Sequence, residues 1–428
     1  MANRQEFYGW KLLAVLFSLD FINMGFPYYG GSVISSYMQI PMSRSTYGWA
    51  FTLINLFVGL AAVFVAMSIV KFGLRATFVI GSTLICCGSL FLGFYAYKPW
   101  HFLIAFGVVN GTGISFATLV PAATAVTRWF RRYRGRAMGI ALSASGFAGL
   151  AASKFLGRML KAAGGNWHAG WKIVACAAVL SGLMALLFVR ESPESLGQTM
   201  DGISELEQSQ PSRTDTLATK YSWTTWQAYG TSTYWLIVLA SVAAQFPFFF
   251  MIAHWPKNLS GAGIAASDVT WAMGLLTMGT LVGRWLGGLL MDVMNARYAY
   301  MIGLCFYFLA SFCALRVTPD SLWTTAYVAS LLTGAAFGWT FTCMNTCTAH
   351  YYGPAAFPKL NGMMVMLTST LASPAGAVGG KIFDRYGSYA RAFEFEAVLA
   401  AVAILAMAFA TMPKPRGASG ATAPPARA

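Results

Sequence analysis

Arg284 lies inside a long apolar stretch of the C-terminal part of the sequence. A guanidinium in the middle of a membrane segment costs about 2.5–3.5 kcal/mol on insertion scales, so it needs a polar cavity or a charged partner. Its planar fork can hold a carboxylate through two parallel hydrogen bonds. We therefore expect Arg284 to bind a small organic anion. A structural ion pair, for example with Asp20, is the alternative.

Two titratable side chains could move a proton. Asp20 lies well inside the first long apolar stretch, where a carboxyl group can either carry a proton or form a structural pair. His254 lies toward one end of a later stretch, and histidine is the residue type used most often as a proton acceptor and donor near neutral pH. We treat both as candidates for proton coupling or gating, with pairing or packing as the alternative.

Several uncharged polar residues within apolar stretches could complete a carboxylate site. They are Tyr28, Tyr29, Asn110 and Asn345. Hydroxyl and amide groups donate hydrogen bonds to carboxylates. The same groups also join helices to one another inside membranes, so both interpretations stay open.

Lys154, Arg158 and Lys161 are spaced i, i+4 and i+7, which places them on one face of a helix. Such a stripe would attract anions, and Lys154 is its deepest member. In the alternative interpretation, the long side chains extend to the membrane surface and take no part in binding.

The elements that must position these residues follow from composition. The chain has 428 residues, of which 57% are hydrophobic and 10% are charged. A soluble domain carries about 25% charged residues, so most of this chain has no water-facing surface. Its apolar runs have the length of a bilayer-spanning helix and lack the alternation of barrel strands. We predict an all-α membrane protein.

Twelve transmembrane helices account for the apolar runs. They are predicted near 10–36, 46–69, 76–97, 101–128, 136–160, 170–190, 233–258, 267–291, 297–317, 322–349, 360–384 and 389–411. We divide the chain into a six-helix bundle over 1–190, a cytoplasmic linker over 191–230, a second bundle over 231–411 and a disordered cytoplasmic tail over 412–428.

The net charge of +15 reflects membrane topology and not nucleic-acid binding, because most Lys and Arg residues lie in the short connections between predicted helices. Arginines crowd the connection between the fourth and fifth predicted helices. This bias predicts that both termini are cytoplasmic, and we expect the inner membrane of a bacterium as the location.

Motifs for other chemistry are missing from the sequence. It has no phosphate-binding glycine loop, no H-E-x-x-H, no paired-Cys metal motif and no nucleophile triad. The seven Cys residues lie in apolar segments, and we interpret them as packing residues. We expect no cofactor, no metal and no enzymatic activity.

The two halves repeat each other in sequence. GRAMGIALSASGFAG in the fifth predicted helix corresponds to LNGMMVMLTSTLASPAG in the eleventh, which aligns Gly139 with Gly362 and Ser145 with Thr368. Duplicated six-helix units are a recurring transporter design, with the substrate site near the midplane between the halves. We therefore predict two pseudo-symmetric six-helix bundles.

At these residues the chain resembles the major facilitator superfamily, and within it the monocarboxylate transporter and oxalate/formate antiporter group. The superfamily's loop signature, G-x-x-x-D-(R/K)-x-G-(R/K), has a good second copy in which Gly288, Asp292 and Arg297 match. The first copy has Val70 in place of its Asp. Segments that resemble motifs of the monocarboxylate transporter and oxalate/formate antiporter group follow one another in the expected order: YGW, RWFRRYRGRAMGIA, SPESLGQTMDG and GKIFDRYGSYARAF.

The resemblance implies specific roles. Arg284 lies eight residues before Asp292, where the family carries its substrate-binding Arg, and Asp292 is assigned to gating. Proton-coupled members use a Lys and an Asp at the positions of Tyr28 and Thr280, so this chain lacks the two residues that couple the proton in those members. Oxalate-carrying members add a cation at the position of Thr368, which makes Thr368 a candidate substrate-binding residue. The absence of that cation favours a monocarboxylate.

The sequence thus predicts a monomeric secondary transporter of lactate-, pyruvate- or formate-like anions that works by alternating access, with a proton as the coupling ion. One alternative is an exchanger of oxalate or another dicarboxylate. Another is a non-transporting membrane sensor, although neither the linker nor the tail is long enough for a signalling domain.

Overall fold

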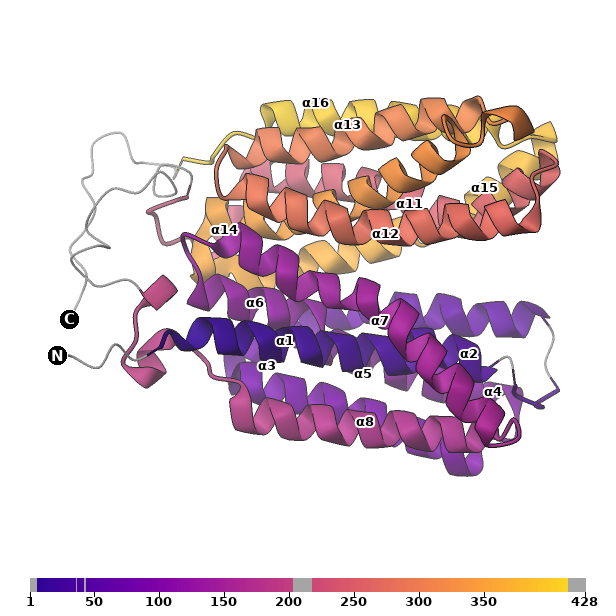
Figure 1. Ribbon diagram of the computed structural model, residues 1–428. Helices are drawn as coiled ribbons and strands as arrows, with labels where there is room; N and C mark the ends of the chain where they lie inside the picture. Colours follow the sequence, from indigo (N-terminus) through magenta and orange to yellow (C-terminus); the bar gives the residue numbers. More distant parts are fainter. Residues whose placement is uncertain (1–5, 36, 42–43, 203–217, 415–428) are drawn as a thin grey trace.

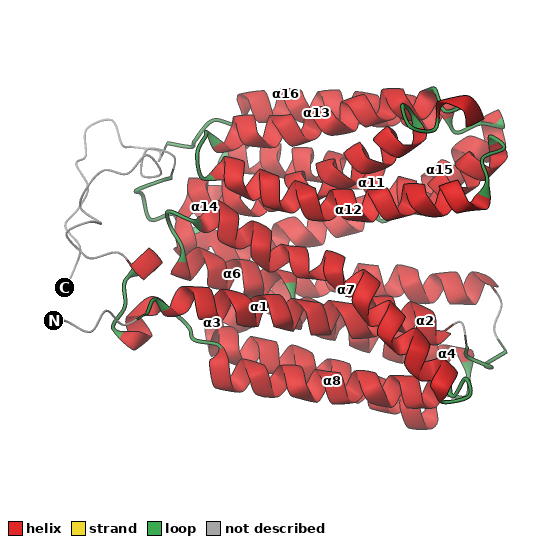
Figure 2. Ribbon diagram, in the orientation of Figure 1, coloured by secondary structure: helices red, strands yellow, loops and turns green. Residues whose placement is uncertain are grey.

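Apolar runs in a bilayer become helices because only a helix satisfies every backbone N–H and C=O within a single span. The computed structural model describes residues 6–35, 37–41, 44–202 and 218–414, and in this part of the chain every regular element is helical (Figure 2). Residues 203–217 of the predicted linker and the predicted tail from residue 415 onward lie outside the described residues.

The helices form two groups that lie one above the other in Figure 1. The first half consists of α1 (Tyr8–Met24), the π-helical η1 (Gly25–Gly30), α2 (Gly31–Ser35), α3 (Arg44–Tyr95), α4 (Pro99–Phe102), the π-helical η2 (Leu103–Asn110), α5 (Gly111–Ala117), α6 (Leu119–Trp129), α7 (Arg134–Ala162) and α8 (Trp167–Phe188). The second half consists of α11 (Ser232–Gly261), α12 (Ala266–Met291), α13 (Ala296–Leu315), α14 (Ala326–Ala372), α15 (Ala375–Tyr386) and α16 (Ala390–Phe409).

Two of these helices contain sharp reversals at glycine. Gly73 in α3 has φ 87° and Gly353 in α14 has φ 72°, a backbone conformation that only glycine adopts without strain. Each reversal divides one continuous element into two membrane spans. Pro354 directly follows Gly353, so the predicted start near residue 360 was too late by about two turns.

The twelve predicted spans are confirmed within the described residues. Nine helices there are long and apolar enough to cross a membrane, and one of them, Trp49–Tyr95, holds two spans on either side of Gly73. The part of α14 before Gly353 supplies one of the remaining two spans. The part after Gly353, continued by α15, supplies the other. The fold is therefore the predicted pair of six-helix bundles.

The described part of the connection between the halves contains two short 3₁₀ helices and one short α-helix. The segment after α8 contains η3 (Pro193–Leu196) and η4 (Met200–Gly202), and α10 (Thr225–Tyr229) precedes α11. Thr224 caps α10 through a reciprocal pair of hydrogen bonds with Gln227. The start of α1 and the end of α16 lie at the same end of the bundle (Figure 1), which we call the terminal face.

The halves meet most extensively along two helix pairs, α7 with α12 and α3 with α14, and α6 and α7 also contact α14. Close approach at the first pair depends on glycine. A Cβ on Gly135 of α7 would lie 2.2 Å from the carbonyl oxygen of Gly288 on α12, and a Cβ on Gly139 would lie 2.5 Å from the carbonyl oxygen of Arg284. Small residues let helix backbones pack closely where hydrophobic burial gives no driving force. This contact brings Arg284 against the first half.

Candidate functional site

A buried polar cluster lies where α7 meets α12. Arg284 is only 7% exposed, and its Nη1 donates hydrogen bonds to the carbonyl oxygen of Leu142 and, at 2.5 Å, to Oγ of Ser145. Its guanidinium carbon lies 5.5 Å from the centre of the Phe341 ring on α14. Nε of Arg284 is buried and has no hydrogen-bond partner among the described residues. One donor of this cation is therefore free for an acceptor.

Asp20 on α1 belongs to the same cluster. Its side chain is 1% exposed and lies beside the backbone N–H of Ser145, and neither carboxylate oxygen is hydrogen-bonded to a side chain in the part of the chain that the structure describes. Its charge and that of Arg284 are close enough to attract each other, yet no direct hydrogen bond joins the two groups. The structure thus brings the two predicted residues together without locking them in a closed ion pair.

The two tyrosines lie on the π-helical segment η1, a type of irregularity that often marks functional sites. Tyr29 is close enough to Arg284 and Asp20 for electrostatic interaction. It packs over Gly149 of α7, where an added Cβ would lie 3.4 Å from the ring. Tyr28 stacks edge-on against Tyr29 with ring centres 5.1 Å apart, and its hydroxyl donates to Oδ1 of Asn55 at 3.1 Å.

Sequence reasoning missed several parts of this cluster. Ser145 had appeared only in the repeat alignment, and Leu142, Asn55 and Phe341 gave no signal at all. Thr280 lies one turn before Arg284, and its hydroxyl donates to the carbonyl oxygen of Thr277 at 2.7 Å. Carbonyl acceptors such as that of Leu142 cannot be found from residue types, because every residue carries one.

Other predicted residues make no hydrogen bond to Arg284, to Asp20 or to the two tyrosines. Asn110 is fully buried and points toward Gly88 of α3, within the first half. Asn345 donates to Phe341 O at 2.8 Å and Thr368 donates to Met364 O at 2.9 Å, so both bond to their own helix. Lys154 is exposed and follows Ser145 by nine residues, about 13 Å along the helix axis.

His254 lies in a separate polar contact within the second half. Its Nδ1 is 3.1 Å from the hydroxyl of Tyr389, and its Nε2 is 2.6 Å from the carbonyl oxygen of Gly376. These partners tie α11 to α15 and to the start of α16. Both ring nitrogens are therefore occupied, and a role in gating or proton relay remains a prediction.

Asp292 joins the two halves at the terminal face. Its Oδ1 accepts from the backbone N–H of Gly135 at 2.6 Å, and its Oδ2 accepts from the backbone N–H of Arg136 at 3.1 Å. The Arg136 side chain adds an ion pair at 3.3 Å. Burial raises the pKa of the Asp292 carboxyl to about 6, against the opposing effect of these partners. The start of α7 is thereby fixed to the end of α12.

Arg134 makes a second contact between the halves at this face. It is 3% exposed, and Nη1 donates to the carbonyl oxygen of Ala349 on α14 at 3.2 Å. Its other donors bond Phe130 and Thr127 within the first half. Sequence reasoning had counted this arginine only as a topology signal. With Asp292, it shows that the halves are held together at the terminal face.

A two-bundle helical membrane protein with a buried polar cluster between the bundles has the architecture of a secondary transporter. The chain belongs to the Major Facilitator Superfamily, whose family pattern matches residues 7–362. Membership makes it a multi-pass membrane transporter and not an enzyme.

Individual relatives are distant. Monocarboxylate transporter 2 of Meriones unguiculatus is 22% identical over 395 residues, which cover 89% of this chain and 80% of that protein. The MFS-type transporter pytF of Aspergillus terreus is 23% identical over 222 residues, 51% of this chain and 67% of that protein. A crystal structure of the transporter FucP in the outward conformation superposes with a TM-score of 0.72 at 12% identity, covering 95% of this chain and all of that one.

Proposed function

We propose that this transporter carries a small monocarboxylate, of the size of lactate, pyruvate or formate, together with a proton. The observation that carries the proposal is the buried Arg284, which lies between the halves with an unpartnered Nε. A carboxylate can accept hydrogen bonds from a guanidinium in a water-excluded site, where the interaction is stronger than in water. The similarity to a monocarboxylate transporter supports the same substrate class.

The charges of the cluster support a monoanion and a coupled proton. Among the cluster residues, Arg284 is the cation and Asp20 is the acid. While Asp20 is ionised, its charge offsets that of Arg284. Once Asp20 is protonated, the cluster is left with one positive charge, which one carboxylate neutralises. Loading a proton and a monocarboxylate together therefore leaves the cluster electrically balanced.

A dianion would leave one negative charge without a partner. Lys154, the cation that could have supplied it, lies about 13 Å from Ser145 along α7. Exchange of oxalate or another dicarboxylate is therefore the less favoured alternative.

Alternating access would proceed by opening the contacts at the terminal face. In the proposed mechanism the Asp292 and Arg134 contacts hold this face closed, and their release lets the halves rock about the cluster. The excess of basic residues there supports a cytoplasmic terminal face. The two sequence relatives named above are eukaryotic, so the bacterial inner membrane remains part of the proposal.

Uptake by proteoliposomes tests the assignment of Arg284. Arg284→Gln should abolish uptake of labelled C1–C4 monocarboxylates, while Arg391→Gln should leave it unchanged. Arg391 is the matched control because it is exposed and pairs with Glu394, outside the cluster. Normal uptake by a correctly inserted Arg284→Gln protein would refute the proposal, as would failure of every monocarboxylate to enter under an imposed pH gradient.

A further inference from the structure

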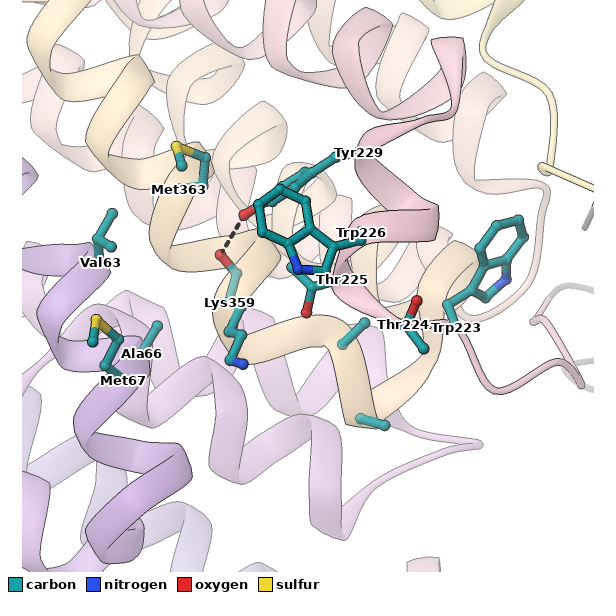
Figure 3. A pocket seen from close by; sticks show the side chains of 12 residues that line it. Val63, Ala66, Met67, Trp223, Thr224, Thr225, Trp226, Tyr229, Lys359 and Met363 are labelled. Atoms are coloured by element: carbon teal, nitrogen blue, oxygen red, sulfur yellow. Dashed lines mark hydrogen bonds between the residues drawn. The ribbon is translucent and has the colours of Figure 1, made fainter.

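A groove between α3, α14 and α10, shown in Figure 3, shares no lining residue with the central cluster. It is bounded by α3 of the first half, by α14 of the second half and by the connection around α10. Its volume is about 540 Å³, within the range of pockets that hold small molecules. The groove therefore has room for part of a ligand and touches both halves of the transporter.

The wall on α3 is apolar. Val63, Ala66 and Met67 are spaced i, i+3 and i+4, so they share one face of the helix. Met67 is 57% exposed, and Met363 of α14 lines the groove across from this wall. This side of the groove suits a hydrocarbon chain.

The opposite side of the groove is polar and basic. Lys359 on α14 is exposed, and it is the one charged residue among the described residues that line the groove. Trp226 of α10 lies nearby and is 84% exposed (Figure 3). Tryptophan gathers at membrane–water interfaces, where its ring reaches the level of the lipid headgroups. A lone cation at that level complements a phosphate.

The structure holds α10 in place against α14. The hydroxyl of Tyr229 donates to the carbonyl oxygen of Lys359 at 3.5 Å, as drawn in Figure 3. Nearby, the backbone N–H of Thr219 donates to the carbonyl oxygen of His350 at 2.7 Å. The connection between the halves thus forms a fixed wall of the groove.

We infer that this groove binds an anionic phospholipid of the leaflet at the terminal face. Its phosphate bonds Nζ of Lys359, and one acyl chain lies along the face of Val63 and Met67. Basic pockets between transmembrane helices on the cytoplasmic side recognise anionic headgroups in this way. Because the walls belong to different halves, the bound lipid contacts both moving parts. This inference does not depend on the substrate proposed above.

Lipid retention by the purified full-length chain tests the inference. The protein is exposed to equal amounts of phosphatidylglycerol and phosphatidylcholine, and bound lipids are counted by native mass spectrometry in the absence of substrate. We expect phosphatidylglycerol to be retained in preference. Lys359→Gln should lower its affinity about five-fold, and Lys359→Glu should lower it further.

Lys71→Gln serves as the matched control, because Lys71 is an exposed cation on α3, one helical turn after Met67, but does not line the groove. Glycerol phosphate should not displace the lipid, because it lacks the acyl chain. Equal retention of both lipids, an unchanged affinity in Lys359→Gln, an equal loss in Lys71→Gln, or displacement by glycerol phosphate would each overturn the inference. Melting temperatures of the variants confirm that they are folded.

Discussion

Nη1 of Arg284 on α12 donates a hydrogen bond to Oγ of Ser145 on α7, so the central cation is held by both halves of the transporter at once. The backbone carbonyl of Leu142 accepts a second bond from the same nitrogen. Any movement that separates α7 from α12 must break these contacts. The residue proposed to bind substrate is therefore also a contact between the two moving bodies.

Replacing Ser145 should weaken this contact. Ser145→Ala removes a hydrogen bond to a charged group, an interaction that contributes about 1.5–3 kcal/mol when buried. We expect the conformational equilibrium to shift away from the state described here. Distances between spin labels on the two halves would measure this shift. Ser143→Ala is the control, because that buried hydroxyl donates to Ile140 within its own helix. Identical distance distributions in both variants would contradict the prediction.

Asp20→Asn should separate proton coupling from substrate binding. Asparagine has nearly the same shape but cannot be ionised, so a pH gradient should no longer drive accumulation of the carboxylate. Exchange of labelled for unlabelled substrate should persist, because Arg284 is retained. Asp268→Asn, at a carboxylate that accepts from the Tyr327 hydroxyl, should behave as wild type. Accumulation by Asp20→Asn at the wild-type level would exclude Asp20 as the proton carrier.

Asp292 should make stability depend on pH. Burial raises its pKa from 3.8 to about 6, so the folded protein binds the proton more tightly than the unfolded chain. Its contribution is greatest below about pH 4 and is lost as pH rises through about 6.

Melting temperatures of wild type and Asp292→Asn, measured across this range, would test this prediction. The wild-type value relative to the variant should fall between about pH 4 and pH 6 and then stay level. A difference that rises with pH, or one that stays flat, would show that the carboxyl does not titrate as described.

Gly139 should be intolerant of even one added methyl group. A Cβ at this position would lie 2.5 Å from the carbonyl oxygen of Arg284, and a backbone atom cannot move aside without separating α7 from α12. Gly139→Ala should therefore cost about 1–3 kcal/mol in the state described here and reduce uptake.

Gly274→Ala is the control for Gly139→Ala. It is also a glycine on a long helix, but no atom lies within 4 Å of the position that its Cβ would occupy. It should melt at or above the wild-type temperature, because alanine favours a helix. Equal uptake by the two variants would contradict the role of Gly139.

Sequence singled out residues of the central cluster where one residue type carries a large energetic cost in lipid. A charged side chain inside an apolar run is costly to place in lipid, so Arg284 and Asp20 could be selected as candidates without knowing their neighbours. The structure places both in one cluster. Uncharged polar residues carry no such cost, because they can bond to their own helix. Asn345 and Thr368 do so, and Asn110 points into the first half.

The sequence by itself determined the helices, their division into two repeated halves and two of the buried charges, Arg284 and Asp20, while the burial of Arg134 and Glu396 was missed. These follow from the length and composition of each span, because lipid admits only a helix with its polar groups satisfied. Tertiary structure alone decided that Arg284 meets Ser145 and that Asp292 fixes the start of α7. Lipid is as apolar as a neighbouring helix, so hydropathy does not specify how each helix is rotated. Close packing at Gly135 and Gly139 fixes the rotation of α7 against α12.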